Sequence, residues 1–309
     1  MKSTLQTINE YALNDPAGLV EKAENHYDRE ITETAQRIAD DDSLKIVAIA
    51  GPSASGKTTT AHILSEKLQK LGEQTEVVSL DDFYLPTEQL PLTEDGKYDI
   101  ESVNALDKAL MKKCFGEIIS TGRTELPKYN FAEKRRILSA RSIDISGKGI
   151  VIVEGLHALN PVITELVPRK NIFKAYISVN RSVFDDNGDV LLTSRQIRLM
   201  RRVLRDRIFR GSSVNETLAL WKGVVEGEKK YLYCFKDTAD VLIKTLHIYE
   251  PCLYRNDFCA LCDETQNITD CRDYFLKTAE AVRKFVPLDE ALIPHNSLIR
   301  EFIGEGKYN

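Results

Sequence analysis

Apolar residues along this chain follow two spacings that alternate from residue 44 onward. Short continuous runs rich in β-branched residues occur at residues 45–50, 75–80, 149–155, 173–179 and 239–246. Such runs are typical of strands covered on both faces, as in a parallel sheet. Because the segments between them are long enough for crossover helices, the pattern predicts an α/β fold with a parallel sheet of about five strands.

Other segments carry apolar residues three and four positions apart, which predicts helices over 59–71, 103–119, 193–210 and 274–285. The segment from Tyr84 to about residue 138 is longer than one crossover needs, so an insertion is expected there.

Helical spacing also marks residues 1–43, where Leu19, Ala23, Tyr27, Ile31, Ala35 and Ile38 form one stripe. These residues end in a run of three aspartates, which suggests a boundary. We therefore expect an N-terminal helical extension (1–43), a core (44–254) and a C-terminal helical segment that packs on the core (255–309).

Composition and charge exclude several classes of protein. No stretch approaches the roughly 18 apolar residues of a membrane span, and the first residues lack the apolar block of a secretory signal. The net charge of −5 provides no general attraction for nucleic acid or anionic lipid. Six unevenly spaced cysteines predict reduced thiols in a cytoplasmic protein, with a zinc site at Cys252, Cys259, Cys262 and Cys271 as an alternative.

Residues 51–58 read GPSASGKT, the spacing of a P-loop, between a predicted strand and a predicted helix. In such a loop the backbone N–H groups and the helix N-terminus face phosphate oxygens. Lys57 would reach the β- and γ-phosphates of ATP, and Thr58 would hold Mg²⁺. A glycine turn without a ligand is the alternative. The predicted nucleotide-binding residues in this segment are Gly51, Ser53, Ala54, Ser55, Gly56, Lys57, Thr58 and Thr59.

Carboxylates follow two of the predicted strands, where ligands of open parallel sheets bind. Asp81 and Asp82 follow the second strand, and Glu154 ends the third. They could supply a Mg²⁺ ligand and a general base, or merely a turn, a helix cap or a loop start. Neighbouring residues in an extended segment point to opposite sides, and we expect Asp81 to be the base.

The predicted helix at 193–210 is rich in arginine, and Gly211 is placed to end it. Ile197, Met200, Leu204 and Ile208 form its apolar stripe. The arginines on a neighbouring face are Arg198, Arg201, Arg202 and Arg205. They predict a lid that clamps phosphates and excludes water; a solvated basic face is the alternative.

Two further signals are weaker. Tyr129 and Phe131 stand beside Lys134 and Arg136 in a predicted loop, where the rings could hold a flat base or serve packing. His157 could be a base, although a structural histidine with a hydrogen bond is the commoner case at such a position.

The motifs GPSASGKTT, SLDDFY, PKYNF with Arg136, VIVEGLHAL and RLMRRVLRDRIFRG occur in this order. Together, over about residues 44–254, they resemble the phosphoribulokinase/uridine kinase family of P-loop kinases. The resemblance implies Asp81 as the base, Thr58, Asp81 and Glu154 around Mg²⁺, and Asp99 on ribose hydroxyls. It also implies Tyr129 and Phe131 around the base, and Arg198 and Arg201 on substrate and phosphates. The remaining predicted site residues are Tyr84, Lys134 and Arg136 for the acceptor, and Arg202 and Arg205 for the nucleotide.

The resemblance thus implies an ATP-dependent kinase that phosphorylates the 5′-hydroxyl of a nucleoside such as uridine or cytidine, with Lys57, Asp81 and Arg201 as catalytic residues. Lys134 stands where uridine–cytidine kinases have a histidine, and EGLH is closer to phosphoribulokinases. A kinase of a sugar phosphate or another small alcohol is therefore an alternative. A nucleotide-driven switch that acts through residues 1–43 is another. The expected partner is the small-molecule acceptor, without nucleic acid or membrane, and assembly into a homo-oligomer is left open.

Overall fold

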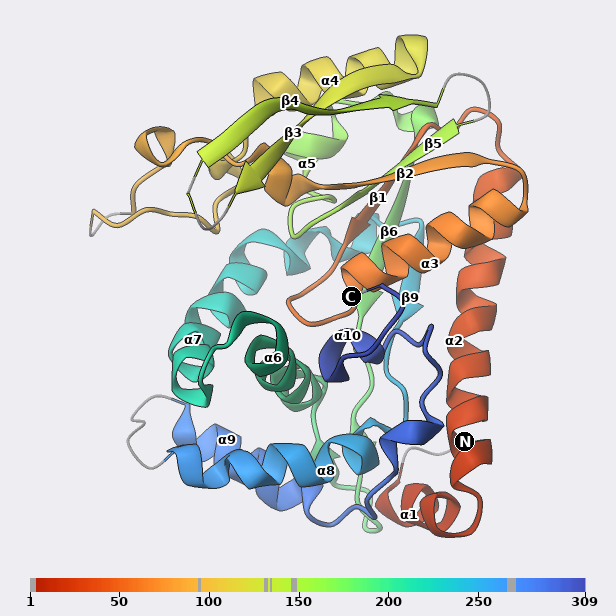
Figure 1. Ribbon diagram of the computed structural model, residues 1–309, viewed down its shortest axis with the longest axis vertical. Helices are drawn as coiled ribbons and strands as arrows, with labels where there is room; N and C mark the ends of the chain where they lie inside the picture. Colours follow the sequence, from red (N-terminus) through yellow and green to blue (C-terminus); the bar gives the residue numbers. More distant parts are fainter. Residues whose placement is uncertain are drawn as a thin grey trace.

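The fold is centred on a parallel sheet in the computed structural model, which describes residues 4–93, 96–130, 133, 135–145, 149–265 and 271–308. Its strands are β1 (Ile46–Ala50), β2 (Gln74–Ser79), β5 (Gly149–Glu154), β6 (Ile172–Ser178) and β9 (Val241–Lys244). They pair in the order β2-β5-β1-β6-β9, and every pairing is parallel (Figure 1). The predicted α/β fold with five parallel strands is confirmed.

Burial explains why the central strands carry continuous apolar runs. All residues of β1 and β5 are buried, because neighbouring strands flank them on both sides and helices cover both faces. The carboxyl ends of β1, β2 and β5 therefore lie side by side at one edge of the sheet. The loops that follow these strands meet there.

Ten α-helices are described: α1 (Leu5–Asn14), α2 (Pro16–Ala39), α3 (Lys57–Lys70), α4 (Lys108–Thr121), α5 (Pro161–Thr164), α6 (Ser194–Arg210), α7 (Val214–Tyr231), α8 (Glu250–Ala260), α9 (Arg272–Val282) and α10 (Arg300–Ile303). Helix α2 runs along one side of the molecule in Figure 1, α3 packs against it, and α6 to α9 form a group below the sheet. A short hairpin, β7 (Val183–Phe184) with β8 (Val190–Leu192), leads from β6 to α6.

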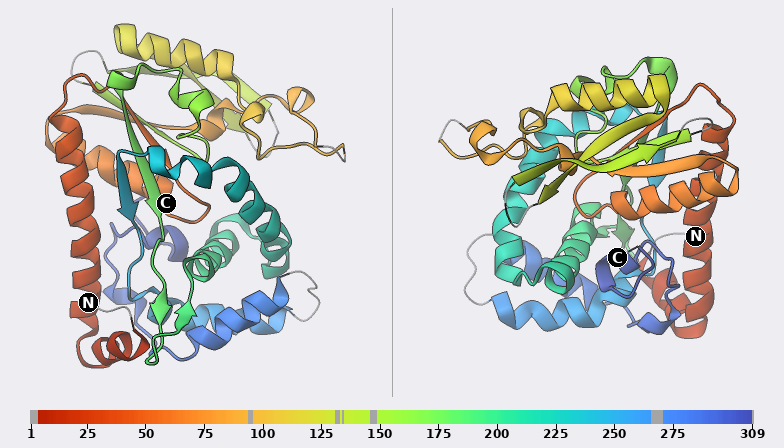
Figure 2. Two further views of the ribbon diagram at one scale, coloured as in Figure 1. Left: turned by 180° about the vertical axis from the view of Figure 1, so that it is seen from behind. Right: turned by 45° about the horizontal axis from the view of Figure 1, so that its top comes forward.

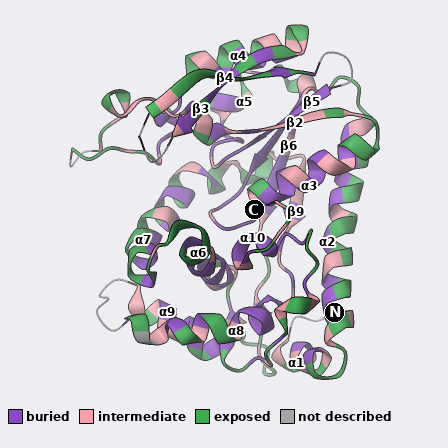
Figure 3. Ribbon diagram, viewed as in Figure 1, coloured by how far each residue is buried: buried purple, intermediate pink, exposed green. Residues whose placement is uncertain are grey.

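The N-terminal helices form part of the main core. Asp15 caps α2 through the Gly18 N–H, and Pro16 occupies the first helical position. The whole predicted stripe from Leu19 to Ile38 is buried. The Tyr27 hydroxyl lies 2.8 Å from that of Thr60 on α3. Apolar residues of α2, α8, α9 and the C-terminal segment share one cluster on one face of the sheet (Figure 3).

The insertion differs from the prediction in two ways. Helix α4 begins at Lys108, because Asp107 accepts the Leu110 N–H and caps it, and the preceding residues form a short 3-10 helix. The segment expected to be a loop around PKYNF is instead strand β3 (Arg123–Asn130), paired antiparallel with β4 (Arg135–Asp144). This hairpin lies beside α4 (Figure 2).

The arginine-rich helix is confirmed as α6. Thr193 and Gln196 form a capping box at its start, and Gly211 ends it at φ 63°. Ile197, Met200 and Leu204 of its apolar stripe are buried, whereas Ile208 is 51% exposed near the end of the helix. Arg198, Arg201 and Arg202 are buried, so the alternative of a solvated basic face is wrong.

All six cysteines are free thiols. Across the described ranges, no cluster of three histidine, cysteine or acidic side chains could hold a metal. None of the helices in those ranges has both the length and the apolar content needed to cross a bilayer.

Candidate active site at the P-loop

The loop after β1 is shaped to receive an anion. Ala54 and Gly56 adopt positive φ angles of 56° and 88°, which turn the backbone inward before α3 begins at Lys57. A side chain at Gly51 would meet the Ile177 carbonyl oxygen at 2.5 Å. The Ser55 hydroxyl is buried without a partner, and no side chain caps the start of α3. These unsatisfied donors suit a phosphate group.

A cavity of about 310 Å³ opens over this loop. Its charged lining residues come from the P-loop, the strand ends, the arginine helix and the C-terminal segment. They are Lys57, Asp81, Glu101, Glu154, Arg202, Arg205, Arg210, Glu228 and Glu301. Five carboxylates thus face four cations in one small space. That balance suits a nucleotide bound together with a divalent cation, because carboxylates alone would repel the phosphates.

The two adjacent aspartates have different surroundings. Asp81 lines the cavity, whereas Asp82 pairs with Lys128 of β3 at 3.1 Å and accepts the Tyr129 N–H at 3.3 Å. The protein around Asp81 desolvates its carboxyl and raises its pKa, with Asp82 adding to the rise and Lys57 opposing it. Asp81 is thus the aspartate that can meet a ligand in the cavity.

Glu154 and Thr58 lie in the same lining. Glu154 is only 6% exposed at the end of β5, and desolvation raises the pKa of its carboxyl to about 7, against the attraction of Lys57. A nearby cation would keep this carboxyl ionised. With Asp81 it offers the oxygen donors that Mg²⁺ prefers.

The predicted arginines fall into two groups. Arg202 and Arg205 line the cavity, as does Arg210. Each lies within 3.4 Å of the buried carboxylate of Asp206. Among the described residues, Glu301 is the other carboxylate paired with this group, 4.0 Å from Arg205. Two carboxylates cannot neutralise three guanidinium groups, so this end of the cavity remains positive.

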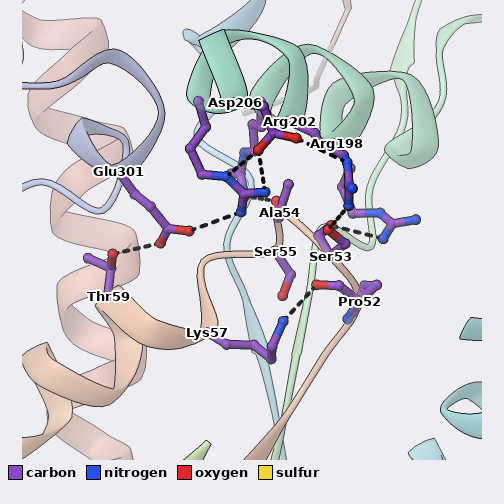
Figure 4. A network of polar contacts seen from close by, with 12 residues as sticks. Pro52, Ser53, Ala54, Ser55, Lys57, Thr59, Arg198, Arg202, Asp206 and Glu301 are labelled. Carbon is purple, nitrogen blue, oxygen red and sulfur yellow. Dashed lines mark hydrogen bonds and ion pairs between the residues drawn. The ribbon is translucent and has the colours of Figure 1, made fainter. Parts of the chain in front are cut away.

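Arg198 and Arg201 are held elsewhere. Both terminal nitrogens of Arg198 bind Glu228, at 2.6 and 2.8 Å. Arg198 also donates to the Ser53 carbonyl (Figure 4). Arg201 is fully buried and donates to Glu250 at 2.7 and 2.8 Å. Neither residue belongs to the lining of the cavity.

The predicted acceptor residues are only partly brought together. Tyr84 lines the cavity, and its ring lies 5.7 Å from that of Tyr129. Asp99 accepts the Tyr231 hydroxyl at 3.2 Å, outside the lining. Arg136 pairs with Asp107 at 2.9 Å. Phe131 and Lys134 lie outside the described residues.

His157 does not line the cavity and is held by contacts to neighbouring residues. Its ring nitrogen Nε2 lies 3.0 Å from the Glu101 carbonyl, and its ring meets that of Tyr231 edge-on. Burial lowers its pKa to about 4, so the ring is neutral at ordinary pH.

Sequence reasoning missed Glu101, Arg210, Glu228 and Glu301 as lining residues. Arg210 was within the arginine-rich helix and could have been added by its spacing from Asp206. Glu301 lies on α10, where it accepts the Thr59 hydroxyl at 2.6 Å and lies 4.0 Å from Arg205 (Figure 4). No local pattern in the sequence relates it to the P-loop.

Known proteins with similar sequences include uridine kinases. A uridine kinase of Vibrio atlanticus is 29% identical over 210 residues, which cover 67% of this chain and 89% of that protein. A uridine kinase of Lactobacillus helveticus is 27% identical over 200 residues, which cover 64% and 85%. The solved structure of D-glycerate 3-kinase from Cryptococcus neoformans covers 82% of this chain and 87% of that one, at 16% identity and a TM-score of 0.34. That score is too low to bear on function.

The family described as Phosphoribulokinase / Uridine kinase matches residues 46–249, the segment that runs from β1 to the residue before α8. The match therefore includes the P-loop, both strand-end carboxylates and the arginine helix. The chain belongs to the phosphoribulokinase/uridine kinase family and is an ATP-dependent phosphotransferase.

Proposed function

We propose that this protein transfers the γ-phosphoryl group of Mg²⁺·ATP to a hydroxyl group of a nucleoside. The observation that carries the proposal is the position of Asp81. It stands in the P-loop cavity with Lys57 and Glu154, and its neighbours there are the uncharged Tyr84 and the acidic Glu101.

On the donor side, residues 51–58 bind the phosphates through backbone N–H groups and Lys57. Thr58, Asp81 and Glu154 would hold Mg²⁺, which neutralises phosphate charge when it is bound. Arg202, Arg205 and Arg210 supply the positive end of the cavity, where charge develops on the transferred group. Arg198 and Arg201 act indirectly, because they donate to the carbonyl groups of Ser53 and Ala54 and so hold the P-loop against α6.

On the acceptor side, Asp81 accepts the proton of the attacking hydroxyl. The raised pKa of its carboxyl makes it a stronger proton acceptor than an ordinary aspartate, and the positive charge of Lys57 opposes that rise. Asp82 is occupied by Lys128 and the hairpin, so it is assigned a structural role.

Charge favours a neutral acceptor over a phosphorylated sugar. Asp81 is close enough to Glu101 to raise the pKa of the Glu101 carboxyl, and an anionic acceptor would be repelled by both carboxylates. Arg136, a cation on β4 of the hairpin that could have bound a sugar phosphate, is already paired with Asp107. A nucleoside offers hydroxyl groups to these carboxylates and a flat ring to Tyr84. The names of the relatives agree with this acceptor class.

The test is an ADP-release assay with Mg²⁺·ATP against a panel of nucleosides, ribulose 5-phosphate and pantothenate. We expect turnover with at least one nucleoside and none with ribulose 5-phosphate. Lys57→Ala should abolish that turnover and weaken ATP binding, because it removes a charge-assisted contact worth about 1.5–3 kcal/mol. Turnover with ribulose 5-phosphate alone would replace the nucleoside by a sugar phosphate.

A further inference from the structure

A second cavity, of about 740 Å³, lies where β6 ends, between the start of α6, the short 3-10 helix Tyr233–Thr238 and α9. It touches the P-loop only at Pro52. The side chains that give it chemical character are three tyrosines and three cations. They are Tyr176, Tyr233, Tyr274, Arg195, Arg198 and Lys236. The proposed kinase chemistry uses none of the tyrosines and neither Arg195 nor Lys236.

The charge of this cavity is one-sided. None of its described lining residues carries a carboxylate, although the chain as a whole has a net charge of −5. Arg195 and Lys236 are exposed, and neither forms an ion pair with any carboxylate in the described part of the chain. Two unpaired cations beside the buried guanidinium of Arg198 favour an anionic ligand.

The tyrosines add a preference for a flat group. They come from β6, the 3-10 helix and α9, so three separate elements converge on the cavity. Tyr176 is 2% exposed at its base, whereas Tyr233 is 36% exposed at its rim. Aromatic faces bind flat rings by stacking, and phenol hydroxyls add hydrogen bonds. An anion that carries a flat ring matches both the cations and the tyrosines.

The wall between this cavity and the phosphate cavity is an ion pair. Arg198 lines the second cavity, and its partner Glu228 lines the first. Glu228 also accepts the Ser53 N–H of the P-loop at 2.8 Å and the Tyr233 hydroxyl at 2.9 Å. An anion that draws Arg198 and Tyr233 toward itself would leave the charge of Glu228 less neutralised, beside the place where phosphates bind.

We infer that the cavity between β6, α6 and α9 is a binding site for a nucleoside monophosphate, and that the bound ligand weakens ATP binding through the Arg198–Glu228 pair. The sign follows from charge, since an under-neutralised Glu228 repels the phosphates of ATP. Because such coupling is reciprocal, ATP must weaken monophosphate binding by the same factor. The inference goes beyond the proposed function and does not depend on which hydroxyl compound is the acceptor.

The experiment is calorimetric titration of AMP, GMP, CMP and UMP, one at a time, into the full chain. The test variant combines Arg195→Ala with Lys236→Ala, which removes both unpaired cations. The control combines Lys112→Ala with Lys222→Ala, exposed lysines that line neither cavity. A second comparison sets Tyr274→Ala against Tyr274→Phe, which keeps the ring. The initial rate of kinase activity of every variant, before product accumulates and without added monophosphate, shows that the fold and the active site are intact.

We expect at least one monophosphate to bind the wild type. The test variant and Tyr274→Ala should each weaken the affinity for that monophosphate tenfold or more. The double lysine control and Tyr274→Phe should leave the affinity unchanged. The Kd of a non-hydrolysable ATP analogue should rise as that monophosphate is added, and this dependence should vanish in the test variant. Equal monophosphate affinity in the wild type and the test variant would place the monophosphate in the active site and overturn the inference. So would the absence of binding at millimolar concentration, or tighter binding of the analogue. The kinase assay with the acceptor panel is unaffected by any of these results.

Discussion

Asp81 and Asp82 are chemically alike, and what separates them is their contacts. Asp81 faces the P-loop cavity, and Asp82 is bound to Lys128 and the Tyr129 N–H. We expect Asp81→Asn to lower kcat by about 10²–10⁴-fold, because an amide cannot take the proton of the acceptor. ATP binding should persist, since the phosphate contacts remain. Steady-state kinetics and calorimetry on the same preparation measure both.

Asp82→Asn is the matched control. It removes the ion pair with Lys128 but leaves the cavity unchanged. We expect it to keep most of the activity. If Asp82→Asn were inactive and Asp81→Asn active, the roles of the two residues would be exchanged.

Glu154 makes stability depend on pH. The pKa of its carboxyl is about 7 in the folded protein, against an ordinary value of 4.5. The folded state therefore holds the proton more tightly than the unfolded chain does. The contribution of Glu154 to the free energy of unfolding is fully present below about pH 4.5. It is lost as the pH rises through 7, a decrease on the order of 3 kcal/mol. We expect the melting temperature of the nucleotide-free protein to fall between pH 5 and pH 8.

Glu154→Gln should remove this part of the pH dependence, because glutamine does not ionise. Thermal unfolding of both proteins over a pH series measures the difference. The gap between variant and wild type should widen with rising pH. Parallel curves for the two proteins would show that Glu154 does not titrate in this range.

At the scale of elements, the sequence predicts what is locally encoded. The spacing of apolar residues predicts the five strands of the sheet, and GPSASGKT with the helical spacing after it predicts α3; all of these elements are present. The β3–β4 hairpin is not predicted, because Pro127 interrupts β3 at a bulge and the side chains of β4 are mostly exposed. The burial of β3 alternates but shifts phase at this bulge, and that of β4 does not alternate, so neither strand has a continuous period of two to detect. Tyr129 was therefore expected in a loop.

The arginine helix shows the same limit within the site. Its position and ends follow from Thr193, Gly211 and the apolar spacing. Which arginines face the cavity does not, since the partners of Arg198 and Arg201 lie on α7 and α8, 30 and 49 residues away. A carboxylate so distant in sequence leaves no local signal in the arginine helix. Yet a guanidinium group that binds such a carboxylate is no longer available to a phosphate.

Substitution of two arginines of α6 should accordingly affect different quantities, stability in one case and kcat in the other. Arg201→Ala leaves the buried carboxylate of Glu250 without its partner, which should lower the free energy of unfolding by about 3–5 kcal/mol. Arg205→Ala removes a cation from the cavity and should mainly lower kcat, because Arg205 is less buried. Urea unfolding and kinetics of both variants distinguish the roles. A stable, inactive Arg201→Ala would instead assign Arg201 to catalysis.

At the scale of the molecule, the C-terminal segment completes the kinase cavity. The family match ends at residue 249, yet Leu298 lies against Gly56 and Glu301 lines the cavity. Phe302 packs over the guanidinium of Arg201, 4.7 Å away. The described C-terminal residues thus touch both the P-loop and α6, so that residues outside the matched region set the shape and charge of the nucleotide site.

Glu301 provides the means to test this arrangement. Glu301→Gln keeps an oxygen to accept the Thr59 hydroxyl but removes one negative charge from a cavity that binds phosphates. Losing this repulsion should tighten ATP binding by about 1 kcal/mol, or roughly fivefold, at low salt. The gain should shrink as salt rises, because ions screen a partly exposed charge. Calorimetry at two salt concentrations measures it, with Glu280→Gln on the exposed face of α9 as the control. Weaker binding by Glu301→Gln would mean that the carboxylate serves ATP by holding Arg205 in place, and the C-terminal segment would then be a support for the arginine helix rather than a source of repulsion.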